Sequence, residues 1–453
     1  MASPTSRWRG APWQGSLTAS GWGFVGTGAV VLIAAQLMGR RDLLHLAVFL
    51  LLVPAVAWLA NRLFRPGLSV DRASDPPVVE AGRHAEVKLS VGHSGVLVGR
   101  LSMAEHLPAS LGEGPDFAYP GHNVGSDGVS RYRYQLACPR RGLYTLGPVE
   151  ARSTDVFGLA EQRTRIDLGT RLTVTPAAVA LASSVLSGLR GIDGVIATRM
   201  QANPSEDDVM TREYRHGDPM RRVHWAATAR QGQLMVRQEE SATSPEATIV
   251  LDLRREAFPV ATGRPAPAGE WSPGPPEFEW AVTAAVSVAA HLADLDYTLR
   301  LLDADGSLAL SHSPSSSAPD APDFTGRAGL AAVAEGLAAI LPRGPENGSH
   351  GAALTPHPGE GFGDLLLDRI EAHRQRGPLV AILGRTSVQD ARVLAPAAGS
   401  AERALALVVT DRPGACRGAV QALRAAGWLA IEATAHTRLE SAWLALTEGM
   451  PPW

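Results

Sequence analysis

The chain has 453 residues, which is too long for one ordinary domain and predicts two or three. Hydrophobic residues make up 45% of the chain, enough for packed cores, and the formal net charge is −3 with a pI of about 6.5. This charge excludes the global basic field that draws a protein to nucleic acid, so no nucleic-acid partner is expected. The two cysteines, Cys138 and Cys416, form neither a metal motif nor a disulfide framework, and they favour a reducing compartment.

Two apolar runs lie near the N-terminus. No charged residue occurs from Ala11 to Gly39, and after "RRD" at 40–42 a second apolar run extends from Leu43 to Ala60. Each run is long enough to cross a bilayer core of about 30 Å. We therefore expect residues 1–65 to form a membrane anchor of two antiparallel transmembrane helices. The alternative is a signal peptide, which would have a shorter apolar core, a cleavage site and no second span after it.

Arginines set the expected orientation of this hairpin. More of them flank its outer ends than lie in its turn, which holds Arg40 and Arg41; those at the outer ends are Arg7, Arg9, Arg62, Arg65 and Arg72. The positive-inside rule then places both termini in the cytoplasm. The prediction is a two-pass protein of the plasma membrane with cytoplasmic soluble domains.

Residues 66–176 have the pattern of short strands. The segments "AEVKLSV" (85–91) and "SRYRYQLA" (130–137) alternate apolar and polar residues, and residues 141–176 continue with Val, Thr, Leu and Tyr broken by Gly and Pro. This spacing predicts a β-sandwich-like domain, with a Gly-rich loop over 112–128. It contains no nucleophile paired with a base and no ligand cluster, so a spacer or binding module is expected.

Residues 241–453 alternate strand and helix. Apolar runs such as "ATIVLDL", "PLVAIL", "ALALVVT" and "WLAIEATA" are separated by segments of helical spacing. That alternation predicts an α/β domain with a doubly wound, mostly parallel sheet. The turn at 304–307 predicts a hairpin that adds one antiparallel strand at the sheet edge. The arrangement resembles a von Willebrand factor A domain.

Metal-binding members of that fold carry Asp-x-Ser-x-Ser after the first strand, where the oxygens bind a hard cation. This chain has "DLRRE" at 252–256, so Asp252 remains but both serines are missing. Arginines in their place would repel a cation. We expect no metal and predict that Asp252 pairs with Arg254, Arg255 or a backbone amide, although residual metal binding stays open.

Residues 177–240 form a predicted linker that holds the unusual segment "YRHGDPMRRVHWAATARQGQLMVR" (214–237). Within it, "GDP" at 217–219 has turn chemistry. The run "MRRVHWAATAR" (220–230) has helical spacing, with Trp225 as a large packing anchor and Gly232 as the end of the helix. Six arginines and four carboxylates between 212 and 240 favour ion pairing over phosphate binding.

Three interpretations of this segment stay open. It could be an ion-paired brace between domains, or its exposed arginines could dock a partner. It could also be an active site that uses Asp218 and His224, but it contains no serine or cysteine nucleophile. Its two histidines, eight residues apart, match no common metal-ligand spacing.

The same segment resembles the signature of the domain of unknown function 58 family, R-x-Y-x-x-G-D-x-x-R-x-I-x-W-x-x-S/T-A-R-x-G-x-L-x-V-R/K, with Val223 for Ile. Residues 140–161, "RRGLYTLGPVEARSTDVFGLAE", are similar to the upstream family pattern R-G-x-Y-x-L-G-P-x-x-x-x-x-x-D-P-F-G-L, with Val156 for Pro. The candidate interaction residues in the signature are Arg212, Tyr214, Gly217, Asp218, Arg221, Arg222, His224, Trp225, Arg230 and Gly232.

The resemblance implies a membrane-anchored protein with a von Willebrand factor A-like region. It also implies a MoxR-type AAA+ ATPase as a partner, and in many cases a transglutaminase-like membrane protein. Our hypothesis is therefore a non-enzymatic adaptor or assembly factor for cell-envelope-related processes, without a cofactor. The alternatives are a cell-envelope enzyme that uses Asp218 and His224, or a purely structural membrane scaffold.

Overall fold

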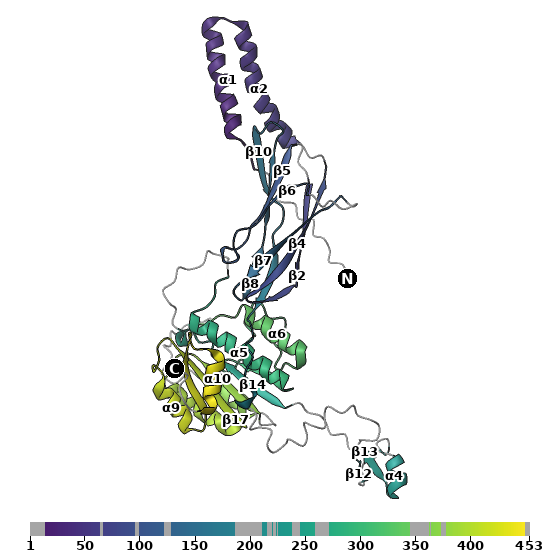
Figure 1. The fold of residues 1–453 in the computed structure, drawn as a ribbon, viewed down its shortest axis with the longest axis vertical. Helices are drawn as coiled ribbons and strands as arrows, with labels where there is room; N and C mark the ends of the chain where they lie inside the picture. The colour runs from purple at the N-terminus through teal and green to yellow at the C-terminus, as the bar shows by residue number, and fades with distance from the viewer. Residues whose placement is uncertain are drawn as a thin grey trace, which may run out of the picture.

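The computed structural model describes residues 14–63, 67–95, 99–121, 128–185, 211–214, 220, 223, 225–237, 245–258, 271–344, 362, 364–372 and 377–448. Figure 1 shows a helical hairpin at the top, a β domain below it and an α/β domain at the bottom. A small unit stands apart from both domains and consists of β12 (Thr211–Glu213), α4 (Trp225–Gln231) and β13 (Met235–Arg237).

The hairpin consists of α1 (Ala19–Met38) and α2 (Arg41–Leu63). Gly39 ends α1 with a φ of 62°, and Gly28 allows close helix packing, since a Cβ there would lie 2.9 Å from Leu51 Cγ. Both helices are long and apolar enough to cross a membrane, by length and composition. The predicted pair of apolar helices is confirmed.

The described β domain contains three sheets. Their strand orders are β1-β10-β9-β5-β6, β3-β11-β8 and β2-β4-β7. The strands are β1 (Gln14–Leu17), β2 (Gly67–Asp75), β3 (Val78–Glu80), β4 (Arg83–Ser94), β5 (Arg100–Glu105), β6 (Asp116–Tyr119), β7 (Ser130–Cys138), β8 (Gly142–Leu146), β9 (Val149–Thr154), β10 (Ala160–Arg165) and β11 (Thr170–Thr175). β1 precedes α1 in the chain and pairs with β10, so the segment before the hairpin joins this domain.

Strand β4 joins the two halves of the β core. Its inward residues alternate, as the sequence predicts, and Ala85 and Val87 pack with β8 and β11 whereas Leu89 and Val91 pack with β5 and β9. One long sheet therefore faces two shorter ones, which confirms a sandwich-like domain. The predicted loop over 112–128 is wrong in part, because β6 lies within it and pairs with β5.

A buried arginine crosses between the layers of the sandwich. Arg72 Nε lies 2.6 Å from Glu105 Oε1, and Arg72 Nη1 lies 2.8 Å from Asp167 Oδ2. The Arg72 side chain is only 1% exposed. Its charge is neutralised inside the protein, so it should not be counted among the arginines that orient the hairpin.

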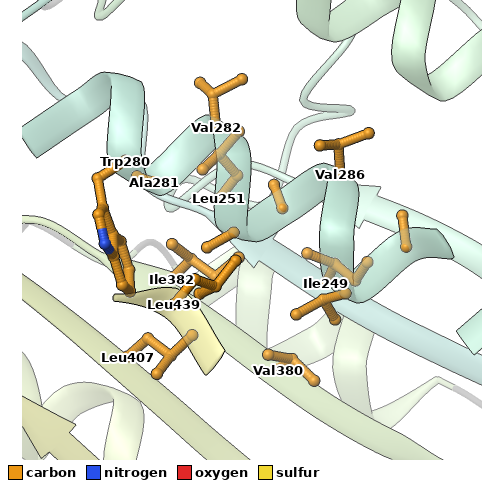
Figure 2. Close-up of a cluster of buried hydrophobic side chains, with 14 of the residues drawn as sticks. Ile249, Leu251, Trp280, Ala281, Val282, Val286, Val380, Ile382, Leu407 and Leu439 are labelled. Atoms are coloured by element: carbon orange, nitrogen blue, oxygen red, sulfur yellow. The ribbon is translucent and has the colours of Figure 1, made fainter. Parts of the chain in front are cut away.

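The α/β domain has a fully parallel sheet in the order β15-β14-β16-β17-β18. The strands are β14 (Glu246–Leu251), β15 (Thr298–Leu302), β16 (Pro378–Leu383), β17 (Arg403–Thr410) and β18 (Leu429–Thr434). Helices α5 (Pro276–Asp294), α6 (Gly326–Ala338) and α10 (Leu439–Glu448) pack on one face. Helices α7 (Asp364–Glu371), α8 (Val388–Leu394) and α9 (Arg417–Ala425) pack on the other. The doubly wound prediction is confirmed, and Figure 2 shows Ile249, Ile382 and Leu407 of the sheet beneath α5.

The predicted antiparallel edge strand is wrong. The turn at Gly306 forms, but beyond it only Leu308 bridges back to Leu302. The chain turns inward instead because Leu310 is buried against α6, and Phe324 takes the outer edge by exchanging two 2.8 Å backbone hydrogen bonds with Leu299.

The first residues of the predicted linker pack on the α/β domain. Leu181 and Val185 lie in its core, Trp443 Nε1 donates to the Ala182 carbonyl at 3.0 Å, and Val179 N donates to Ser287 Oγ at 2.9 Å. Residues 179–185 thus belong structurally to the α/β domain, ahead of the signature segment in the chain.

Candidate functional site

The signature residues fold into a small unit, which we call the signature unit and define as residues 211–214, 220, 223 and 225–237. Strands β12 (Thr211–Glu213) and β13 (Met235–Arg237) pair antiparallel, and α4 (Trp225–Gln231) packs on β13. Thr228 Oγ1 accepts from Met235 N at 3.0 Å, and Gly232 follows the helix with a φ of 72°. The predicted helix over 220–230 is therefore confirmed only from Trp225, since Val223 forms a β-bridge with Val236, and Gly232 ends the helix as predicted.

The exposure of this unit differs from the prediction in one respect. Val223, Met235 and Val236 are buried, but the Trp225 side chain is 63% exposed. The interpretation of Trp225 as a packing anchor is wrong, because its ring is left exposed while Val223, Met235 and Val236 are the buried apolar residues described in this unit. Met220 and Leu234 are also exposed, so this unit presents apolar surface to solvent.

The structure describes the candidate interaction residues unevenly. Tyr214 is half-buried, its backbone N donates to the Leu234 carbonyl at 2.8 Å, and Arg230 and Gly232 are exposed. Arg212 belongs to β12. The others lie outside the described residues, so their pairing or catalytic use stays a prediction: Gly217, Asp218, Arg221, Arg222 and His224.

At the carboxyl end of β14, the structure places an internal ion pair at the position where the predicted von Willebrand factor A resemblance would put a metal site. The fully buried carboxylate of Asp252 accepts from Arg254 Nε and Nη2, both at 2.9 Å, and from the backbone N of Arg254 and Gly384 at 3.0 and 3.2 Å. The predicted pairing of Asp252 with Arg254 and backbone amides is confirmed.

Arg254 is held from three sides. Besides Asp252, its Nη1 lies 3.8 Å from Asp390 Oδ2 of α8, and its guanidinium lies 4.6 Å from the centre of the Phe362 ring. Burial disfavours its charge, but the neighbouring carboxylates, Asp252 foremost, together outweigh this and raise the pKa of Arg254. A fixed positive charge thus occupies the crevice where open α/β sheets bind ligands.

A second ion pair closes the same edge of the sheet. Asp303 follows β15, and its carboxylate lies 2.7 Å from Arg343 Nη2 while accepting from the backbone N of Leu253 and Ala304. Burial raises the pKa of Asp303. Within the described ranges, no group of three or more His, Cys, Asp or Glu is placed to hold a metal ion. The arrangement ties loops together rather than leaving a carboxylate free for acid–base chemistry.

The joint between the β domain and the α/β domain depends on Arg141, a residue that sequence reasoning did not single out. Its side chain is 3% exposed, and its Nε and Nη2 each lie 2.8 Å from the Glu279 carboxylate at the start of α5. Its guanidinium also donates to three carbonyls at the end of α6: Leu337, Ala338 and Ile340.

The residues beside Arg141 complete this joint. Gly142 packs directly against Trp271, since a Cβ there would lie 2.5 Å from Trp271 Cε3. Tyr144 Oη donates to the Arg140 carbonyl at 3.0 Å, its ring lies edge-on to Trp271, and burial raises the pKa of Tyr144 to about 12. The available signal was the upstream "RRGLY" pattern, which now has a structural role.

Comparisons with known proteins give a family match over a short segment of the chain. No curated protein matches this sequence. A CARDB domain of the PF1109 protein from Pyrococcus furiosus is 14% identical with a TM-score of 0.16, covering 24% of this chain and 94% of its own. Cwp6 from Clostridium difficile is 8% identical with a TM-score of 0.13, covering 84% of this chain and 55% of its own. At such TM-scores neither likeness informs the fold.

The family described as "Protein of unknown function DUF58" matches residues 210–259. This span holds the signature unit, strand β14 and the Asp252–Arg254 pair. Over these residues the predicted resemblance to the domain of unknown function 58 family is confirmed.

Proposed function

We propose that this protein is a membrane-anchored, non-enzymatic adaptor or assembly factor that docks a cytoplasmic partner through its signature unit. The observation that carries the proposal is the exposed indole of Trp225, 63% accessible, on a unit that stands apart from both domains in Figure 1. Trp and Arg are the residue types most enriched among those that dominate binding energy at protein interfaces.

Docking explains the exposure better than a brace does. A tryptophan that braced two domains would be buried between them, whereas the interdomain contact is made by Arg141, Gly142 and Trp271. Met220 and Leu234 add exposed apolar surface to the same small unit. Burying such surface against a partner would stabilise a complex at about 25 cal/mol for each Å² removed from water.

We further infer that the α/β domain is a degenerate von Willebrand factor A-like domain. The support is a doubly wound sheet with Asp252 after its first strand, although the antiparallel edge strand of the prediction is missing. Arg254 stands in the cation's place, so partner contacts at this edge would use fixed charge instead of a bridging metal. The hairpin would hold both soluble domains at the cytoplasmic face of the plasma membrane.

The family resemblance suggests a MoxR-type AAA+ ATPase as the partner. It also suggests a transglutaminase-like membrane protein as a further partner. The test is affinity purification of the tagged full chain in mild detergent, with the retained ATPase identified by mass spectrometry and ATP hydrolysis. Trp225→Ala should lose the ATPase. Leu168→Ala, which removes an exposed apolar side chain from the β domain, should keep it. Equal retention by both variants, or no ATPase with the unaltered chain, would count against the proposal.

A further inference from the structure

The turn between β9 and β10 presents two adjacent apolar side chains to solvent. Val156 is 73% exposed and Phe157 is 75% exposed. The backbone beneath them is fixed, because the buried Asp155 carboxylate accepts from the backbone N of Phe157 at 2.9 Å and of Leu159 and Ala160 at 2.6 Å. The protein thus holds this apolar pair in a defined position.

The turn is attached to the first turn of α1. Thr18 N donates to the Leu159 carbonyl at 2.9 Å and Thr18 Oγ1 donates to the Gly158 carbonyl at 2.6 Å. Thr18 is also the N-cap of α1, since its Oγ1 accepts from Gly21 N at 3.1 Å. Phe157 is therefore the neighbour of Gly158, whose carbonyl accepts the hydrogen bond from the N-cap residue Thr18.

The end of α2 holds the same turn from its other side. Asn61 Nδ2 donates to the Ala160 carbonyl at 3.1 Å, and Ala57 packs against Leu159 and Ala160 in a small buried cluster. Because the turn contacts both helices, its position along the axis of the hairpin is fixed.

That height falls at the edge of a bilayer. The 20 residues of α1 span about 30 Å, which equals the hydrocarbon thickness, so the boundary lies near Thr18. The headgroup layer extends roughly 5–7 Å farther on each side. Trp22 and Trp58 are exposed about one turn inside this boundary, where interfacial tryptophans gather.

We propose that the Val156–Phe157 tip inserts into the interfacial layer of the lipid bilayer, as a third membrane contact beside the two helices. The inference rests on the proposed membrane anchoring. The lipid surface is the expected occupant because the exposed apolar tip belongs to a turn that is hydrogen-bonded to the cap of α1, at the level where the bilayer boundary is expected. Insertion by the tip would fix the tilt of the β domain against the membrane.

The test uses the full chain in phosphatidylcholine liposomes with an environment-sensitive fluorophore on single introduced cysteines. The native Cys138 and Cys416 are buried, and the unaltered chain controls for their labelling. The positions are Phe157→Cys at the tip, Ile33→Cys on the exposed face of α1, and Leu168→Cys, an exposed apolar residue after the far end of β10.

We expect nitroxides near the headgroup to quench the label at 157 and lipid to shield it from aqueous iodide. The label at 33 should respond to nitroxides on the acyl chain, and the label at 168 to iodide alone. If 157 behaves like 168 while 33 is quenched by lipid, the tip insertion is refuted and the anchoring stands. If 33 is also insensitive to lipid, the anchoring itself fails.

Shielding of 157 from iodide without any lipid quenching would show a protein contact, such as a second copy of the chain, and would also overturn the inference. Val156→Cys repeats the measurement in case the loss of the Phe157 ring disturbs the turn.

Discussion

Replacing Arg141 with methionine should uncouple the two soluble domains. The change keeps the apolar stem but removes the guanidinium that bridges Glu279 and the end of α6. Removing one partner of a buried ion pair costs about 3–5 kcal/mol, and the low end applies here because the Glu279 side chain is 28% exposed and can rehydrate. The carbonyls at the C-terminus of α6 also lose a cation, an effect of up to about 2 kcal/mol. We expect a total loss of about 3–5 kcal/mol in the free energy of unfolding.

The assay is urea unfolding of the full chain in detergent, followed by tryptophan fluorescence, to which Trp271 in the joint contributes. Arg140→Met is the matched control, since Arg140 is the exposed neighbour. A double-mutant cycle with Glu279→Gln should give a coupling of at least about 1.5 kcal/mol. A loss for Arg141→Met within about 1 kcal/mol of that for Arg140→Met, or a coupling near zero, would refute this reasoning.

Three further predictions follow from the described contacts. Gly142→Ala should destabilise the same joint by about 1–3 kcal/mol in urea unfolding, because its Cβ would meet the Trp271 ring. Mg²⁺ or a chelator should leave the Tm unchanged, since Arg254 and backbone amides already hydrogen-bond the Asp252 carboxylate. The variant Asp252→Ala should lower the Tm, because it leaves Arg254 buried without its partner. Burial lowers the pKa of His291, so its neutral form stabilises the fold above the unfolded pKa of about 6.5 and this contribution is lost as the pH falls. His291→Leu should therefore lose less stability than the unaltered chain between about pH 7.5 and 5.5, measured by urea unfolding at both values.

Local patterns predicted most of the elements. The strands of the parallel sheet are apolar runs because both of their faces are buried, and β4 alternates because only one of its faces is. Asp252 and Arg254 are two residues apart, so their pairing could also be inferred from the sequence. Each of these features depends on residues that are close in the chain.

The wrong predictions concern residues whose position is decided by contacts with parts of the chain that are distant in sequence. The segment after Gly306 has a hairpin turn, but Leu310 gains more from burial against α6 than from pairing at the sheet edge. Arg72 looked like a flanking charge of the hairpin until the fold placed Glu105 beside it. Trp225 was predicted to be a packing anchor because the sequence does not show which apolar residues are buried. In the signature unit these are Val223, Met235 and Val236.

The upstream family pattern, residues 140–161, makes structural contacts at both of its ends. Arg141 and Gly142 lie against the α/β domain, and Asp155 to Ala160 lie against the bases of both apolar helices. β8 and β9 connect these two joints over 14 residues, a path of at most about 45 Å at 3.3 Å per residue. A segment that is fixed at both ends sets the distance between the two apolar helices and the α/β domain. Gly142, Asp155 and Arg141 in this pattern therefore have structural roles, and under the proposed docking function the partner contacts are expected at Trp225 and the exposed surface around it.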